Sequence, residues 1–348
     1  ALDARSFCYR ALGRSVSGAD CSRAITELKA DPAYAWLKDA NSTAITQALR
    51  DQDRAFANFY AKRAGFPKFK SKRGPQSARY QLDQRHIGRT FDAETHLLKL
   101  PKLGALKLRW SRKVGGTPKM VTVSRDACGR YFAAFGCEAL IEPLPMTTKS
   151  VGVDLGLASV VTLSDGFKSG APRYIRRYAR RLRKAQRALS RRVKGSHRWQ
   201  RMRQRVARIQ ARIADCRRDF VHKLSFRVVR DHGLIAREDL NVKGLMRALR
   251  LSKSAADASL GELVRQIDYK AQWHGRDVIK IGRFARSTGV CPECGAVGQR
   301  LPLNVRRWRC ECGAEHDRDI AAAQVILLTA VGCTVEARGA VHQPTAVA

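Results

Sequence analysis

The sequence predicts a multidomain α+β protein, with an N-terminal helical lobe, a small β-barrel, and a mixed α/β domain interrupted by a cysteine module. Three observations predict this class. Apolar residues recur at helical spacing in the first ninety residues and alternate with a period of two from about 95 to 138. Pro143 and Pro145 mark a boundary near 145, and four clustered cysteines interrupt the last third of the chain. A chain of 348 residues is also too long for one comfortable core.

The first ninety residues are expected to be helical. Asp31 predicts an N-cap because Pro32 follows it at the first helical position, and Asn41 or Ser42 predicts the cap of the next helix. The segment from Gly65 to Gly74 interleaves aromatic residues with lysines in a Gly/Pro frame. This segment is either a loop that stacks on bases and pairs with phosphates or a solvated linker.

Residues 91–145 are expected to form a small antiparallel sheet or barrel. Apolar and other residues alternate in three segments separated by turn sequences. The segments are Leu106–Trp110, Met120–Ser124 and Tyr131–Phe135.

A second, mixed α/β unit is expected from residue 146. Val151–Leu157 is predicted to be a buried strand interrupted by one carboxylate, with Val160–Leu163 as its hairpin partner. Apolar runs and apolar residues at helical spacing also predict two further strands, a helix between them and a final helix after the cysteines. These elements are expected at 234–240, 260–267, 278–281 and 320–328.

Two long basic helices are predicted between Arg173 and Arg218. This stretch contains nineteen Lys and Arg residues and a single acid, Asp215, around clean apolar stripes. A charge run is commonly no more than a solvated face. The imbalance here favours an antiparallel helical pair that packs through its apolar seam and places its outer face on a phosphate backbone.

The overall charge indicates a polyanionic partner. The chain has 67 Lys and Arg against 30 Asp and Glu, a net charge of +37, and an ordinary 44% of hydrophobic residues, so the charge lies on a folded protein. Nucleic acid is the expected partner, and a merely cationic soluble surface is the alternative. Without eighteen consecutive apolar residues or a signal-peptide layout, no membrane or secreted role is expected. Since residue 1 is Ala, a leading segment is expected before it.

The cysteines predict one metal site. Cys291-x-x-Cys294 and Cys310-x-Cys312 form two knuckles, and the fifteen residues between them can form a β-hairpin. Four thiolates with no open position suit one structural, tetrahedral Zn²⁺, whereas cysteines buried without a metal are the alternative. The other six cysteines are scattered, as in a protein of a reducing compartment.

Three acids stand out by their settings. Asp154 interrupts a buried strand, Glu238 lies at a strand end, and Asp319 precedes an apolar helix, where it could be an N-cap. Together they have a chemical rationale, because in-line phosphodiester cleavage uses two Mg²⁺ about 4 Å apart, and Mg²⁺ prefers carboxylate oxygens. Asp317 competes with Asp319 for this role and is itself a possible helix cap.

The motifs around these residues resemble the TnpB family, which bacterial insertion sequences encode and which is related to compact type V CRISPR effectors. The resemblance covers nearly the whole chain, including the Phe66–Arg73 loop and the segment from Leu100 to Phe135. One departure is Ala321, where the family usually has Asn. The motifs are Val-Gly-Val-Asp154-Leu-Gly, Arg-Glu238-Asp-Leu-Asn-Val-Lys-Gly, and Cys-x-x-Cys…Cys-x-Cys-Gly-x-x-His-Asp-Arg-Asp319.

The resemblance implies an RNA-guided DNA endonuclease with an RNase H-like RuvC α/β domain and an inserted zinc ribbon. It assigns Asp154, Glu238 and Asp319 as the catalytic acids that bind two Mg²⁺, and Cys291, Cys294, Cys310 and Cys312 as ligands of one Zn²⁺. Its partners would be a guide RNA and target double-stranded DNA in the bacterial cytoplasm, at the nucleoid. The expected domains are a recognition-like lobe (1–90), a wedge-like domain (91–145), the RuvC-like domain with the basic helices (146–285), the ribbon (286–316), and the last RuvC motif with a tail (317–348).

Other functions remain open at this stage. Because of Ala321, a nuclease-inactive, RNA-guided DNA-binding regulator is the main alternative. A junction-cleaving resolvase that acts without RNA and a strand-joining transposase would also use three acids, although the helical lobe and the cysteine module exceed what a resolvase needs.

Overall fold

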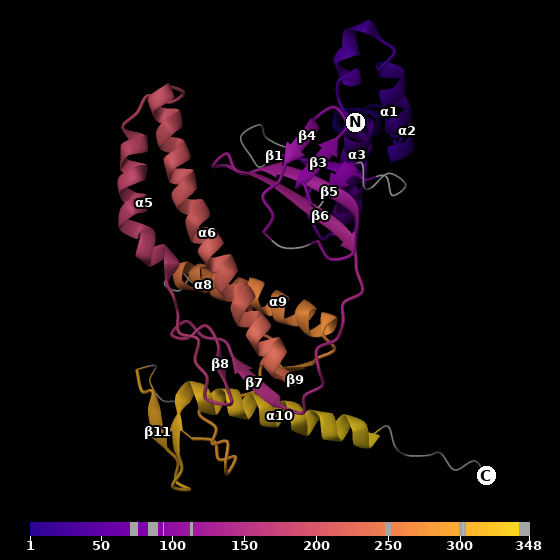
Figure 1. The fold of residues 1–348 in the computed structure, drawn as a ribbon. Coiled ribbons are helices and arrows are strands. Elements are labelled where there is room, and N and C mark those ends of the chain that lie inside the picture. Colours follow the sequence, from indigo (N-terminus) through magenta and orange to yellow (C-terminus); the bar gives the residue numbers. More distant parts are fainter. Residues whose placement is uncertain are drawn as a thin grey trace, which may run out of the picture. The chain divides into compact units, whose positions relative to one another are not determined.

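The structure is a computed structural model that describes residues 1–69, 76–82, 90–92, 94–111, 114–247, 252–298, 302 and 304–340 (Figure 1). The chain divides into two compact units, Ala1–Leu140 and Ile141–Ala348. This division falls a few residues ahead of the boundary expected near 145.

The first unit begins with helices whose starts follow the predicted caps. The Asp31 carboxylate accepts the N–H of Ala33, and the Asn41 side chain accepts the N–H of Ala44, so both predicted caps are confirmed. Asp31 begins a 3₁₀ helix rather than an α-helix. The elements are α1 (Leu2–Leu12), α2 (Gly18–Leu28), the 3₁₀ helix η1 (Pro32–Lys38) and α3 (Ser42–Tyr60).

The β-rich part of the first unit differs from the prediction in two ways. Gln76–Gln81, expected in the helical lobe, is a strand that pairs antiparallel with the strand Thr117–Arg125 along its whole length. Among the described residues the strands form two open three-stranded sheets, β1-β5-β6 and β2-β3-β4, and not a closed barrel. The strands are β1 (Gln76–Gln81), β2 (Phe91–Asp92), β3 (Leu97–Leu100), β4 (Gly104–Lys107), β5 (Thr117–Arg125) and β6 (Tyr131–Glu138).

The two sheets share one apolar core. Tyr80 of β1, Leu98 of β3 and Val121 of β5 belong to the same buried cluster, so both sheets cover it with their inner faces. The segment after α3 is partly packed as well, because Phe66 makes edge-to-face contacts with Phe56 and Phe59. The rest of the proposed base-stacking loop, residues 70–74, lies outside the described residues.

The second unit is built on a mixed four-stranded sheet in the order β10-β9-β7-β8. β7, β9 and β10 are parallel, and β8 pairs antiparallel with β7 as the hairpin partner that the sequence predicts. The strands are β7 (Ser150–Asp154), β8 (Thr162–Leu163), β9 (Leu234–Glu238) and β10 (Asp277–Ile281).

Helices cover both faces of this sheet (Figure 1). Ile235 of β9 belongs to the core shared with α6 and α9, whereas the next residue, Ala236, packs with α10. α10 lies against β7 where the strand carries Gly152, since a Cβ there would come 1.8 Å from the carbonyl oxygen of Ala323. The helices are α6 (His197–Asp231), α7 (Val242–Arg247), α8 (Ser252–Ala258), α9 (Leu260–Trp273) and α10 (Arg318–Ala340).

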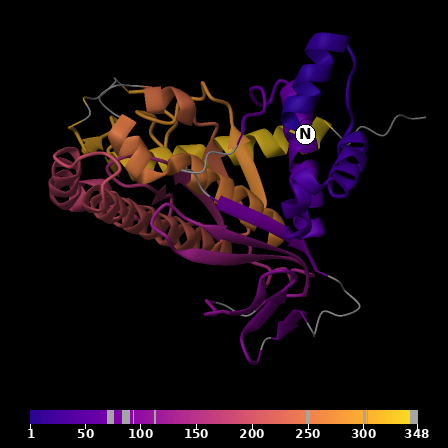
Figure 2. The same cartoon turned by 90° about the horizontal axis from the view of Figure 1, so that it is seen from above.

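The predicted basic helical pair is present. α5 (Tyr174–Ser190) and the first half of α6 lie side by side in both views (Figures 1 and 2). Their shared seam is apolar and includes Ala185, Val206, Ile209 and Ile213. Among the described residues, no helix has the length and apolarity that a membrane span requires.

The cysteine module, residues 286–316, differs from the hairpin that was expected between its knuckles. Each knuckle instead lies within its own short β-pairing. An isolated bridge joins Val290 to Val297 around the first knuckle, and β11 (Arg307–Arg309) pairs with β12 (Glu315–Asp317) around the second. The fifteen residues between the knuckles, as far as the structure describes them, therefore do not form one hairpin.

Candidate active site and metal centre

Two of the three predicted acids end neighbouring parallel strands. Val153 of β7 is the partner of Arg237 on β9, so Asp154 and Glu238 follow at the same level of the sheet. Arg237 is buried and fixes this end of β9, since its guanidinium donates to the carbonyl oxygen of Glu238 and forms a bidentate pair with Asp268 of α9. The strand register therefore places both carboxylates at one edge of the sheet.

The third acid comes from the start of α10. Asp319 is in the first turn of this helix and is 20% exposed. The Asp317 carboxylate accepts the N–H groups of Asp319 and Ile320, so Asp317 is the helix cap. Asp319 does not serve as this cap, and its carboxylate is left to face the strand ends.

The three acids are close enough to repel one another. Burial raises the pKa of Asp154 to about 7, and the negative charges of Glu238 and then Asp319 act in the same direction. The Lys168 ammonium opposes this shift. An ionised Asp154 is therefore costly in the folded protein, and a bound cation would remove that cost.

This repulsion predicts a pH-dependent effect on stability. The pKa of Asp154 is about 7 in the folded protein, above its ordinary value of 3.8, so its ionisation destabilises the fold fully above pH 7 and not at all below about pH 4. In buffer free of divalent ions, Asp154→Asn should raise the free energy of unfolding by about 2–4 kcal/mol at pH 8 and by less than half of that at pH 5. Thermal denaturation at both pH values measures this, and an equal change at both would contradict it.

Two cations and a hydroxyl surround the acids, and none of them was predicted from the sequence. Lys168, in the hairpin after β8, donates to Asp317 at 2.7 Å and to Asp319 at 3.5 Å. Arg306, just ahead of β11, donates to Asp319 at 3.3 Å, and the Ser287 hydroxyl donates to Glu238 at 2.5 Å. The sequence gives no signal for these residues, because each depends on contacts between distant segments.

The donor set fits a hard divalent cation. Carboxylates from three separate elements interact at one edge, where all three residues are partly buried. Mg²⁺ prefers such oxygen ligands and keeps other positions for water and phosphate. The acids are spread more widely than the four cysteines, which are the one group of metal-ligating side chains in the described part of the chain with all ligand atoms within 4.8 Å.

The four cysteines fit a tetrahedral zinc ion. The sulfur atoms of Cys291 and Cys312 lie 3.8 Å apart, and those of Cys294 and Cys310 lie 3.6 Å apart. Zn–S bonds of about 2.3 Å require sulfur–sulfur distances of about 3.8 Å in a tetrahedron, and these two distances match that value. All four ligand atoms lie within 4.8 Å of one another. The remaining cysteines with described side chains form no disulfide: Cys8, Cys21, Cys128, Cys137 and Cys216.

Hydrogen bonds stabilise the thiolate at Cys291. Burial acts to raise its pKa, but the backbone of Cys294 and Glu293 and the side chain of His316 outweigh burial and lower it to about 6. His316 is only 8% exposed, and its Nε2 atom lies 3.2 Å from the Cys291 sulfur. Its ring also contacts Trp308 of β11. The buried histidine therefore supports this ligand in the manner of an outer-shell partner.

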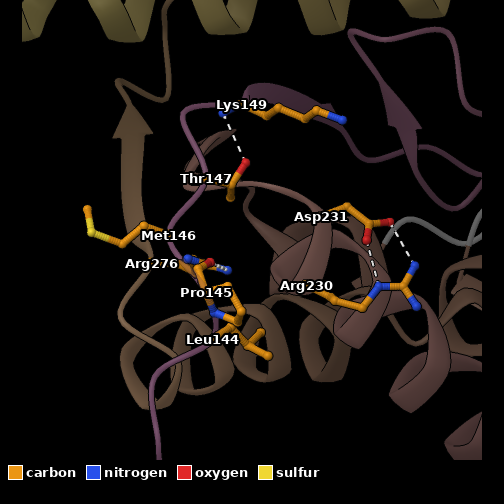
Figure 3. A pocket seen from close by; sticks show the side chains of 8 residues that line it. All are labelled: Leu144, Pro145, Met146, Thr147, Lys149, Arg230, Asp231 and Arg276. Atoms are coloured by element: carbon orange, nitrogen blue, oxygen red, sulfur yellow. Dashed lines mark hydrogen bonds and ion pairs between the residues drawn. The ribbon is translucent and has the colours of Figure 1, made fainter.

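A pocket elsewhere in the second unit is separate from the acids. It is lined by the segment from Leu144 to Lys149, by Arg230 and Asp231 at the end of α6, and by Arg276 (Figure 3). Arg230 and Asp231 pair with each other there. Lys149 and Arg276 directly precede β7 and β10, so this pocket lies at the amino ends of the parallel strands, opposite the edge that carries Asp154 and Glu238.

Comparison with known proteins identifies the family. A candidate RNA-guided DNA endonuclease of Streptomyces pristinaespiralis is 43% identical over 343 residues, covering 97% of this chain and 83% of the relative. The chain belongs to the TnpB family. The candidate RNA-guided DNA endonuclease InsQ of Escherichia coli K12 is 34% identical, covering 79% of this chain and 71% of the relative. The resemblance that the sequence motifs predicted is thereby confirmed.

Two family models match parts of the chain, and one solved structure shares its fold. The OrfB_IS605 model, described as a probable transposase, matches residues 121–249, and the Cas12f1-like TNB domain matches residues 261–326. A Cas12f1–sgRNA–target DNA complex solved by cryo-EM shares the fold with a TM-score of 0.55 at 14% identity, covering 93% of this chain and 78% of that chain. The TNB match includes the whole cysteine module, residues 286–316, and the third acid, Asp319.

Proposed function

We propose that this TnpB protein is an RNA-guided, Mg²⁺-dependent DNA endonuclease with a RuvC-like active site. The observation that carries the proposal is the meeting of Asp154, Glu238 and Asp319 at one sheet edge, where burial and mutual repulsion raise the pKa of Asp154. The names of its relatives as candidate RNA-guided DNA endonucleases support the same activity.

The three acids would hold two Mg²⁺ ions. When bound, Mg²⁺ stabilises charge on the attacking and leaving oxygens of a phosphodiester. The residues of the chain prepare this site, because Arg237 fixes the strand end that carries Glu238 and the Asp317 cap fixes the start of α10 beneath Asp319. Lys168 and Arg306 pair with Asp319 and partly neutralise its charge.

The four cysteines would bind one structural Zn²⁺ as a zinc ribbon inserted ahead of α10. Their sulfur spacing and the buried His316 beside Cys291 support this assignment. In the first unit, the helices would serve as the recognition-like lobe and the two small sheets as the wedge-like domain. Because β1 pairs with β5, the wedge-like part is now proposed to include Gln76–Gln81.

The basic pair of α5 and α6 would contact nucleic acid. All nineteen Lys and Arg residues from 173 to 218 are exposed except Arg217, whose guanidinium donates to the carbonyl oxygen of Ala256. A face of this charge density releases counterions when it binds a phosphate backbone. A guided nuclease needs such sequence-independent contacts, because base pairing supplies its specificity.

This surface predicts a change in salt dependence. Six Arg→Gln substitutions on α5 and α6 should weaken target binding by the guide complex about 10- to 100-fold at 150 mM salt and reduce the slope of log Kd against log salt by up to about 5. The six residues are Arg180, Arg183, Arg187, Arg201, Arg205 and Arg208. Filter binding at four salt concentrations measures both quantities. The control variant carries Lys at the same six positions and should keep the wild-type slope. An unchanged slope in the Gln variant would mean that this surface does not contact nucleic acid.

The RNA that copurifies with the protein tests the guided function. Expression with native flanking DNA should yield one discrete RNA with a variable end, and heterogeneous or absent RNA would mean that the positive charge binds DNA directly. The alternative is a nuclease-inactive regulator, which Ala321 suggests because the family usually has Asn there. That function would give the same RNA without Mg²⁺-dependent cutting. Binding of chromosomal DNA would place either protein at the bacterial nucleoid.

A further inference from the structure

The cysteine module contacts the acid cluster from both of its ends. At its start, Ser287 is 7% exposed and donates its hydroxyl to Glu238 at 2.5 Å. Near its end, Arg306 donates to Asp319, and the carbonyl oxygen of Arg306 accepts the N–H of Arg318 at 2.8 Å. These three contacts join residues 49, 13 and 12 positions apart, so they exist only when the module is folded.

The cysteines themselves are linked to the same edge. The Cys291 sulfur lies 3.2 Å from Nε2 of His316, and the next residue, Asp317, caps the helix that carries Asp319. Four positions separate Ser287 from Cys291. Loss of the metal would free both segments, because a small metal site of this kind has little apolar core of its own to keep it folded.

The Ser287 hydrogen bond restricts Glu238. It uses Oε1 of the carboxylate and leaves Oε2 for another ligand. Outer-shell donors of this type orient a ligating carboxylate, and their removal commonly lowers metal affinity about 10- to 100-fold. Lys168 is different, because it reaches Asp319 from the β8 hairpin and does not depend on the cysteine module.

We propose that Ser287 is a positioning residue that the zinc-bound cysteine module holds against Glu238, so that zinc occupancy of the four cysteines increases the divalent-cation affinity of the acid cluster. The inference rests on the proposed function, since it takes Glu238 as a metal ligand. It extends that function by making zinc occupancy of the four cysteines a control on the catalytic site, through a hydrogen bond between residues 49 positions apart.

Terbium binding to the full-length protein without nucleic acid tests the proposal. Tb³⁺ is a hard cation that prefers oxygen ligands, so its luminescence reports the acids and not the thiolates. Ser287→Ala should bind Tb³⁺ about 10- to 100-fold more weakly with zinc content unchanged, and Ser287→Thr should restore binding. The neighbouring exposed hydroxyl provides the control, since Thr288→Ala should match the wild type.

A zinc-free variant tests the link to the module. Cys310→Ser/Cys312→Ser should weaken Tb³⁺ binding, and adding Ser287→Ala to this variant should weaken it little further, because the hydrogen bond of Ser287 is already lost. Ser287→Ala within twofold of the wild type would overturn the role of Ser287, and full affinity in the zinc-free variant would overturn the link to zinc. If Asp154→Ala binds Tb³⁺ as tightly as the wild type, the acids form no cation site and the nuclease proposal itself fails.

Discussion

Asp154→Ala should reduce cleavage of a matched DNA duplex by the protein–RNA complex at least about a thousandfold, a loss of roughly 4 kcal/mol of transition-state stabilisation. Asp154 ends the central strand β7 and is the acid whose pKa the other two raise, so its removal takes a ligand from the middle of the cluster. Target binding should stay within about twofold, because the basic surface that we propose to bind phosphates lies on other elements. Initial cleavage rates and filter binding on the same preparations separate the two effects.

The control for this substitution lies on the same sheet. Asp277 begins β10 at the amino end of the parallel strands, is exposed, and is remote from the acid cluster. Asp277→Ala should therefore cleave at the wild-type rate. Loss of DNA binding in Asp154→Ala, or cleavage within tenfold of the wild type, would mean that Asp154 is not a catalytic metal ligand.

Cys310→Ser/Cys312→Ser should abolish zinc binding and inactivate the nuclease. The purified wild-type protein should contain one zinc per chain and the variant less than about 0.1, because two serines leave only two thiolates of a four-thiolate site. Cleavage should fall at least about a hundredfold, since the module carries Ser287 and Arg306 to the acids. Elemental analysis and cleavage rates on one preparation test both expectations.

A matched cysteine provides the control for the zinc experiment. Cys8 lies on α1 in the first unit, far along the chain from the quartet, and is a free thiol. Cys8→Ser should keep one zinc per chain and full activity. If Cys310→Ser/Cys312→Ser retains one zinc per chain, the four cysteines are not the zinc site.

Much of the second unit could be predicted because its signals are local. The apolar run around Asp154 predicts a buried strand, and an acid in such a strand needs a partner or a metal. Glu238 is likewise an acid at the end of a predicted strand. Parallel pairing of the two strands then places Asp154 and Glu238 at one edge of the sheet. The apolar stripes of α5 and α6 likewise predict the seam that the structure contains. The cysteine spacing alone predicts the metal centre.

The rest depends on pairing between distant segments, which periodicity does not reveal. Gln76–Gln81 has no clear alternation, and it becomes a strand because β5 offers it a partner. Likewise, alternation predicts strands but not their grouping into two small sheets over one core. Ser287, Lys168 and Arg306 are unremarkable in sequence, and each gains its role from a carboxylate 13 to 151 positions away.

The most direct test of the central claim is programmed cutting. The protein, purified with its RNA, is given a duplex that matches the variable end of that RNA, and then the variable end is replaced so that it matches a second duplex. The proposed function predicts Mg²⁺-dependent cleavage that moves from the first duplex to the second and disappears in Asp154→Ala. Cleavage that ignores the change of RNA end, or no cleavage of either duplex with Mg²⁺ and intact RNA, would contradict an RNA-guided endonuclease.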